Sequence, residues 1–168
     1  MSLPRRFRAT VAVAAAFSGL ALLAVPAPAV DGRPVPPPGC TGPASNTWLN
    51  VTVEGLRNSN GQIAVTLYAD NSRKFLVRHG SVYVGRAAAQ ANSMRTCIFV
   101  PQPGVYVLAL YHDENGNQKF DRTGIGLPAE GYGFSNNPST LAGLPSFRSV
   151  RLAVPHTGLA TRVHMKYP

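Results

Sequence analysis

Acidic residues are scarce in this sequence, which has seven aspartates and glutamates against sixteen lysines and arginines among 168 residues. The basic residues are spread along the chain, with no run of five or more like charges. No nucleic-acid-binding motif accompanies them. We therefore expect a solvated basic surface and no nucleic-acid partner.

The sequence also lacks the common catalytic motifs. There is no nucleophile elbow, no HExxH pair, no Walker loop and no dinucleotide fingerprint. The four histidines do not have the spacing of a metal triad, and no partner base is evident for Cys97 as a nucleophile. These absences favour a non-catalytic protein.

Long apolar runs are absent except for one at the N-terminus. Arg5, Arg6 and Arg8 precede an uncharged run over 9–25, and Ala27-Pro28-Ala29 follows as a small-residue cleavage site. We interpret residues 1–29 as a signal peptide, with an uncleaved membrane anchor as the alternative. The run is short for a spanning helix, which needs roughly 20 residues, so we expect no transmembrane segment after cleavage. The predicted location is secreted or periplasmic.

Cysteine is nearly absent, because the chain has only Cys40 and Cys97. Both follow the predicted cleavage point, and an even count in an oxidising compartment favours a disulfide. A bridge between them would close a loop worth about 4 kcal/mol in the chain-entropy model. Two free thiols and a lipidated Cys40 are the alternatives.

Long helical patterns are missing as well. Prolines at 34 and 36–38 predict an extended linker over residues 30–45, followed by a single folded domain over 46–168. Apolar and polar residues alternate in that domain, with turn residues between the segments, and 105–111 is nearly all apolar. We predict an all-β Greek-key sandwich of about seven strands. The strands are expected at 48–56, 61–69, 82–88, 93–100, 105–111, 147–154 and 158–167, and a short helix only at 75–79 or 87–89.

A polar segment follows the most apolar predicted strand. Its oxygen-bearing side chains alternate at Asp113, Asn115, Asn117 and Asp121, a spacing that suits a hard cation such as Ca²⁺. The EF-hand glycine and terminal glutamate are missing, so any calcium site here is expected to be weak. Glu114 or Glu130 would then complete the shell. The alternative is an ordinary polar turn without an ion.

A glycine-rich segment over 124–137 comes next. It carries Tyr132, Phe134, Asn136 and Asn137, which offer aromatic faces and amide hydrogen bonds to a ligand. Glycines beside both aromatics leave room for approach, so we expect both rings to be partly exposed. The alternative is an Ω-loop that packs its own aromatic residues against the domain.

Three motifs together resemble a known family. They are Tyr111-His112-Asp113-Glu114-Asn115-Gly116-Asn117, the block over 130–137 and Pro145-Ser146-Phe147. They are similar to the bacterial exported family known as domain of unknown function 2141, over about residues 49–167. The resemblance implies a small secreted or periplasmic β-sandwich of the transthyretin or carboxypeptidase-regulatory kind. It implies no activity. Gln118 departs from the usual pattern of that family, which weakens the cation interpretation.

The function predicted from these observations is an exported, non-catalytic binding or envelope-associated module. Its partner would be an envelope or extracellular protein or a saccharide, which the sequence does not identify. The alternative is a small extracytoplasmic hydrolase that uses His112, Asp113 and Glu130.

Overall fold

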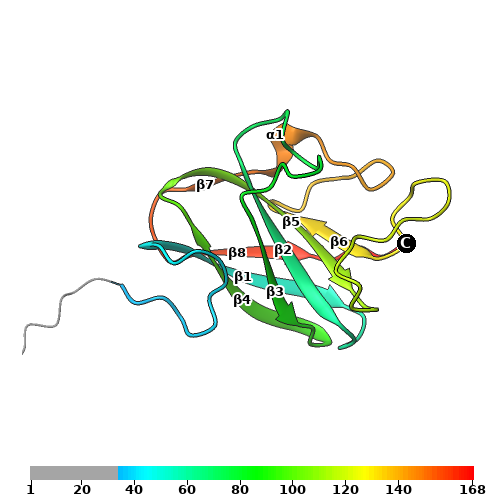
Figure 1. Ribbon diagram of the computed structural model, residues 1–168, viewed down its shortest axis with the longest axis horizontal. Helices are drawn as coiled ribbons and strands as arrows, with labels where there is room; N and C mark the ends of the chain where they lie inside the picture. The colour runs from blue at the N-terminus through cyan, green and yellow to red at the C-terminus, as the bar shows by residue number, and fades with distance from the viewer. Residues whose placement is uncertain (1–33) are drawn as a thin grey trace, which may run out of the picture. The chain divides into compact units, whose positions relative to one another are not determined.

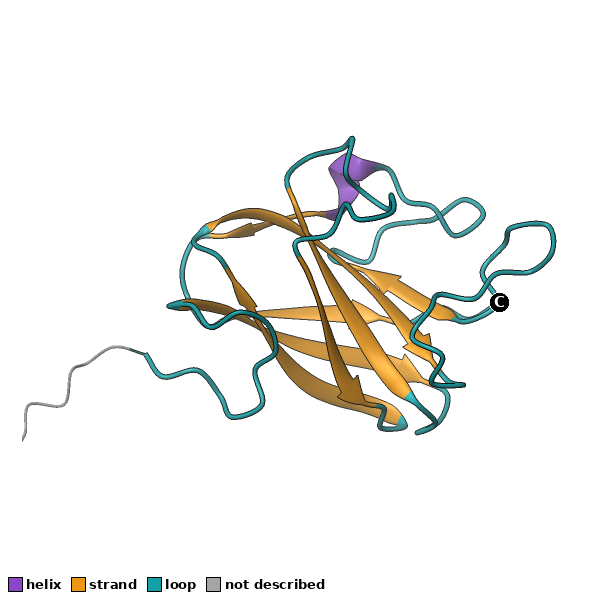
Figure 2. Ribbon diagram, in the orientation of Figure 1, coloured by secondary structure: helices purple, strands orange, loops and turns teal. Residues whose placement is uncertain are grey.

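The structure is a computed structural model that describes residues 34–168. The predicted signal peptide therefore lies outside the described residues. Within them the fold is all-β, with eight strands and one helix of four residues (Figure 2). The strands are β1 (Thr47–Leu56), β2 (Gln62–Ala69), β3 (Tyr83–Ala88), β4 (Asn92–Val100), β5 (Gly104–Asp113), β6 (Gly131–Phe134), β7 (Arg151–Val154) and β8 (Leu159–His164), and the helix is α1 (Phe147–Val150).

The strands form two sheets. One has three strands in the order β4-β1-β8, in which β1 pairs antiparallel with β4 and parallel with β8. The other has five strands, in the order β3-β2-β5-β6, with β7 paired to the other end of β5 (Figure 1). Sequential strands β2 and β3 form a hairpin, and the chain then returns to the first sheet, where β4 lies beside β1.

The main core lies between the two sheets. Its side chains come from alternate positions of the strands, as the period-two pattern predicts, and the largest are aliphatic. Leu49 of β1, Ile63 of β2 and Leu108 of β5 are fully buried there. Each such side chain contributes roughly 1.5–3 kcal/mol through removal of apolar surface from water. The clearest alternation of apolar and polar residues in the sequence therefore comes from strands whose apolar side chains point to this inner face.

A second apolar cluster covers part of the outer face of the five-stranded sheet. Val107 of β5 and Phe134 of β6 meet Val150 of α1, and Phe75 packs against them from the 70–82 loop. Figure 1 shows this loop and α1 at the same end of the domain. Because β5 is covered on both faces, its near-continuous apolar composition is explained.

The predicted elements match the observed ones with three main differences. The segment predicted as a strand over 147–154 is half helix, because α1 occupies its first four residues and β7 the rest. Strand β6 was not predicted, so the described residues contain eight strands rather than about seven. The helix expected at 75–79 or 87–89 is wrong, since the first segment forms turns and β3 runs into the second.

The disulfide between Cys40 and Cys97 is confirmed, and the two residues are 57 positions apart in the sequence. It joins the segment before β1 to β4, and backbone hydrogen bonds add to this connection. Thr41 donates its amide to the Cys97 carbonyl at 3.0 Å and accepts from the Phe99 amide at 2.9 Å. This segment is therefore held beside the outer strand of the three-stranded sheet.

Candidate functional site

A pocket opens on the outer face of the five-stranded sheet, beside the second apolar cluster. Its volume is about 500 Å³. The floor comes from outward-facing residues of β2, β5 and β6, and three loops, over 70–82, 114–130 and 138–146, supply the walls. The principal residues are Thr66, Tyr68, Tyr111, Tyr132 and Phe134 in the floor, with Leu76, Arg78, Phe120, Arg122 and Leu144 in the walls.

Tyr132 and Phe134, both predicted to contact a ligand, line this pocket. They lie on β6, directly opposite Tyr111 and Ala109 of β5, and their ring centroids are 6.1 Å apart. Tyr132 is half-buried, whereas Phe134 is only 6% exposed and belongs to the second apolar cluster. The expectation of partial exposure is therefore confirmed for Tyr132 and wrong for Phe134.

The glycines beside these aromatic residues do not make room for a ligand. An added Cβ at Gly131 would lie 2.3 Å from the ring of Tyr167, and one at Gly133 would lie 2.6 Å from the side chain of Val163. Both glycines therefore face the inner side of the sheet, where the C-terminal segment approaches the backbone of β6. Their small size serves packing of the fold.

Asn136 and Asn137 are placed away from the pocket and bind backbone groups. The amide nitrogen of Asn136 donates to the carbonyls of Ser149 and Arg151, at 3.2 and 2.8 Å. The side-chain oxygen of Asn137 accepts from the His164 amide at 2.7 Å. Both residues have positive φ, of 65° and 49°, which asparagine tolerates better than most residues. They connect the end of β6 to neighbouring segments.

The predicted cation loop divides into two parts. The amide nitrogens of Asn115 and Asn117 both donate to Oδ2 of Asp121, at 2.7 and 2.8 Å. Asp113 does not join them. It is fully buried, its Oδ2 accepts from the Gln118 amide at 2.9 Å, and Nη1 of Arg86 lies 3.4 Å from the same oxygen. The four predicted ligands therefore do not converge on one point through their oxygens.

Asp113 instead has Glu130 as its neighbour. The last pair of the β5–β6 ladder is His112 with Gly131; Asp113 follows His112 as the last residue of β5, and Glu130 immediately precedes Gly131. Glu130 is 5% exposed, and its Oε2 accepts from the Asp121 amide at 3.1 Å. Burial raises the pKa of Glu130, backbone hydrogen bonds from Asp121 and Glu114 oppose this, and the charges of Asp121 and Asp113 raise it further. Oδ1 of Asp113 and Oε1 of Glu130 are both buried without a hydrogen-bond partner.

Glu114, the residue after Asp113, has a different environment. Nε of Arg57 donates to it at 2.8 Å, a second Arg57 nitrogen completes a bidentate pair, and Asn58 donates at 2.6 Å. The hydrogen bond from Arg57 lowers the pKa of Glu114, against the effect of partial burial. The pKa values of Glu114 and Glu130, at the same end of the sheet, are therefore shifted in opposite directions.

His112 is fully buried, and both of its ring nitrogens have partners. Nδ1 lies 2.7 Å from the Tyr167 hydroxyl, and Nε2 lies 2.8 Å from the Asn60 carbonyl. Successive residues of a strand point to opposite faces, and Asp113 bonds Arg86 on the outer face. His112 is thus turned away from Asp113 and Glu130.

Neither a metal cluster nor a spanning helix is found in the part of the chain that the structure describes. Over residues 34–168, no three His, Cys, Asp or Glu side chains gather closely enough to hold a metal ion by themselves. In the same range no helix is long and apolar enough to cross a membrane.

Several pocket residues have no counterpart among the sequence predictions. Phe120 and Arg122 come from the loop that was considered for cation binding, Leu76 and Arg78 from the segment where a short helix was expected, and Leu144 from the loop before α1. Phe120 packs against Tyr111 with ring centroids 5.6 Å apart, and the Arg122 guanidinium lies 5.0 Å from its ring centre. A lone aromatic residue in a polar loop was the only signal available for them.

The fold and these features define a small two-sheet β-domain with a pocket on one outer face. Its sequence matches, over residues 51–162, the family model described as uncharacterized protein conserved in bacteria, domain of unknown function 2141. The chain belongs to this family, as the sequence motifs predicted. Comparisons with curated proteins and with solved structures found no match.

Proposed function

We propose that this protein is an exported, non-catalytic binding module of the bacterial envelope, and that its ligand occupies the outer-face pocket. One observation carries the proposal: Tyr132 and Phe134, in the segment most typical of the family, line a cavity of about 500 Å³. A cavity of this size is within the range of small-molecule sites, which are concave and mostly apolar with a few polar groups.

The lining of the pocket indicates the chemistry of the ligand. The floor is aromatic and apolar, which suits a ring or an apolar group. Arg78 and Arg122 are the charged lining residues, and none of the fourteen lining residues is acidic. The predicted ligand is therefore an aromatic or apolar group with a negative charge, belonging to an envelope or extracellular protein or saccharide.

Export is supported by the disulfide and by the N-terminal pattern. Disulfides persist in the periplasm and outside the cell, and are rare in the cytosol of mesophiles. The Cys40–Cys97 bridge fits such a location. A basic segment, an apolar run and a small-residue cleavage site precede it in the sequence.

We also propose that the two sheets have Greek-key connections, as in transthyretin-like and carboxypeptidase-regulatory-like domains. The return of β4 to the side of β1 after the β2–β3 hairpin supports this. The parallel pairing of β1 with β8 closes the three-stranded sheet.

The non-catalytic part of the proposal is supported by the environment of His112. A hydrolase using His112, Asp113 and Glu130 needs the imidazole within reach of a reacting group and of an orienting carboxylate. Both ring nitrogens instead contact Tyr167 and Asn60, at 2.7 and 2.8 Å. The hydrolase alternative is therefore the less well supported of the two.

A binding titration with 8-anilinonaphthalene-1-sulfonate tests the pocket, because this probe combines aromatic rings with an anionic group. We expect binding with enhanced fluorescence, and Leu144→Glu should weaken it at least about tenfold by placing a like charge in the wall. Leu141→Glu is the matched control. Leu141 lies in the same loop and is 86% exposed, but does not line the pocket.

A second variant addresses the aromatic floor. Tyr132→Ala should also weaken binding of the probe, whereas Phe134 is left in place because it is buried in the outer cluster. Because this probe also binds loosely packed states, each variant must unfold cooperatively. Equal binding by Leu144→Glu and the parent protein, or an equal loss with Leu141→Glu, would refute the pocket as the site.

A further inference from the structure

Asp113 and Glu130 are buried carboxylates that are only partly satisfied by hydrogen bonds. Asp113 is fully buried and Glu130 is 5% exposed. Each has one oxygen in a hydrogen bond, and each has one oxygen that is buried without a partner. An unsatisfied buried polar group costs roughly 1–3 kcal/mol, and more when it is charged. Two such oxygens at one place therefore indicate a missing partner.

The backbone places these two oxygens at one end of the outer face. The β5–β6 ladder ends with the His112–Gly131 pair; Asp113 follows His112 as the last residue of β5, and Glu130 immediately precedes Gly131. The two carboxylates are close enough for the charge of Asp113 to act on Glu130. A single ion placed between the strands can therefore reach both carboxylates.

The local charge is also incompletely balanced. Arg86 is the basic side chain that contacts Asp113, at 3.4 Å, and it also donates to the Tyr111 hydroxyl and the Gln118 carbonyl. Asp121 adds a third carboxylate, whose backbone amide binds Glu130. No salt bridge among residues 34–168 involves Glu130 or Asp121, so Arg86 balances the charge of Asp113 alone, and a divalent cation would neutralise the remainder.

We propose that a hard divalent cation of the calcium type binds between Oδ1 of Asp113 and Oε1 of Glu130. Calcium takes oxygen ligands in flexible geometry, including backbone carbonyls and water. Asn115 and Asn117 are not ligands in this site. They support it through Asp121, to which both donate. The ligand set thus differs from the one that alternation along the loop predicts.

The expected affinity follows from the number of ligands. Two protein carboxylates are fewer than the three or more of tight calcium sites, so water and the main chain must supply the remainder. We therefore expect a Kd of about 10⁻⁴–10⁻³ M, the range of extracellular calcium modules. Neither Asp113 nor Glu130 lines the outer-face pocket, and the existence of the cation site does not depend on what the pocket binds.

Calorimetric titration of the full mature protein with CaCl₂, at constant ionic strength and after treatment with a chelator, tests the site. Glu130→Gln keeps the shape of the side chain and removes its charge, and should weaken calcium binding at least about tenfold. Asp113→Asn should do the same. Glu114→Gln is the matched control, because it removes an equal charge next to Asp113 from a carboxylate that Arg57 and Asn58 already satisfy.

Glu114→Gln should change the Kd for calcium by less than about threefold. Glu114 does not contact the ion in this proposal, so its charge acts on the ion only at a distance and is screened by solvent and salt. Thermal melting in chelator shows that each variant is folded, and Glu130→Gln carries the test if Asp113→Asn does not fold. The proposal is overturned if the parent protein takes up no calcium at about 20 mM, well above this range of Kd. It is also overturned if Glu130→Gln binds as the parent does, or if Glu114→Gln loses as much affinity as Glu130→Gln.

Discussion

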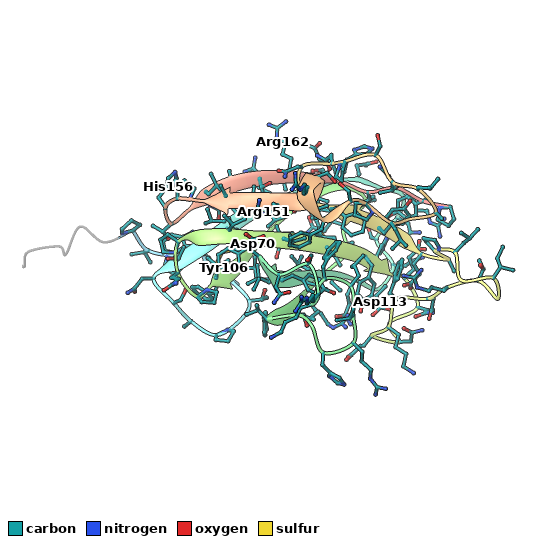
Figure 3. All side chains as sticks on the ribbon, turned by 90° about the horizontal axis from the view of Figure 1, so that it is seen from above. Asp70, Tyr106, Asp113, Arg151, His156 and Arg162 are labelled. Carbon is teal, nitrogen blue, oxygen red and sulfur yellow. A yellow bond between two sulfur atoms is a disulfide. The ribbon has the colours of Figure 1, made fainter. Side chains whose placement is uncertain are left out.

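The two faces of the five-stranded sheet differ in what covers them. The inner face meets the three-stranded sheet, and its side chains are mostly aliphatic and buried. Within residues 34–168, the outer face meets α1 and three loops, and its side chains are aromatic toward the centre and charged at one end. In Figure 3, Asp113 is labelled at that end, near the loop that follows β5.

This difference explains where function can be located on the domain. Two sheets that pack face to face exclude water along their whole length, because their side chains interdigitate. Loops cover a sheet less completely, so the outer face retains a pocket of about 500 Å³ and two carboxylate oxygens without partners. The core that stabilises the fold is therefore concentrated on one face of the sheet, and the proposed binding sites lie on the other.

The largest expected effect is on the inner face. Leu108→Ala removes a fully buried side chain of β5 from the core between the sheets. It should lower the free energy of unfolding by roughly 2–5 kcal/mol, the range for such cavities. Urea denaturation measures the change. Leu144→Ala, at the 52% exposed rim of the pocket, is the comparison and should change stability by less than about 0.5 kcal/mol. Similar losses for the two variants would abolish the distinction between the faces.

An intermediate effect, of opposite sign, is expected at the charged end of the outer face. In chelator at pH 7, Glu130→Gln should raise the free energy of unfolding by roughly 1–3 kcal/mol, because it removes a buried charge with an unpartnered oxygen. Glu114→Gln should instead lower it by less than about 1 kcal/mol, since its pair with Arg57 is partly exposed.

The effects of Glu130→Gln and Glu114→Gln on the free energy of unfolding should depend on pH in different ways, which distinguishes a buried unpartnered charge from a salt bridge. The pKa of Glu130 is raised in the fold, so its cost is fully present above that raised pKa. This cost disappears as the pH falls below the unfolded value of about 4.3. The pKa of Glu114 is lowered, so its stabilisation is present above the unfolded value and is lost as the pH falls through the folded pKa. Urea denaturation of the parent protein and both variants between pH 7 and pH 3.5 measures the two effects. A destabilised Glu130→Gln variant in chelator would mean that the second oxygen of Glu130 has a partner.

The smallest effect concerns the aromatic cover of the outer face. Phe75 contacts Tyr68, Phe134 and Phe147, with ring centroids 5.5, 6.2 and 5.6 Å apart. Phe75→Leu retains an apolar side chain but loses these edge contacts, and should cost about 1 kcal/mol. Thermal melting detects a change of this size. A loss as large as that of Leu108→Ala would show that the outer cluster is as essential to the fold as the core between the sheets.

The inner face was largely predictable from the sequence. Alternation along β1, β2 and β4 is a local pattern with a period of two residues, and it specifies which side chains are buried before any partner is known. Strand β6 escaped prediction because it has four residues and two of them are glycines. Their role became visible only when Tyr167 and Val163 were found against them.

The sequence by itself determined the all-β class, the family and the pairing of the two cysteines, because each rests on a local pattern or on a count. Tertiary structure alone decided the position of His112, the division of the predicted cation loop and the meeting of Asp113 with Glu130. These depend on strand register and on loops that converge from distant parts of the chain. A one-residue change of register would turn Asp113 to the other face of the sheet, and no pattern within the loop itself records that choice.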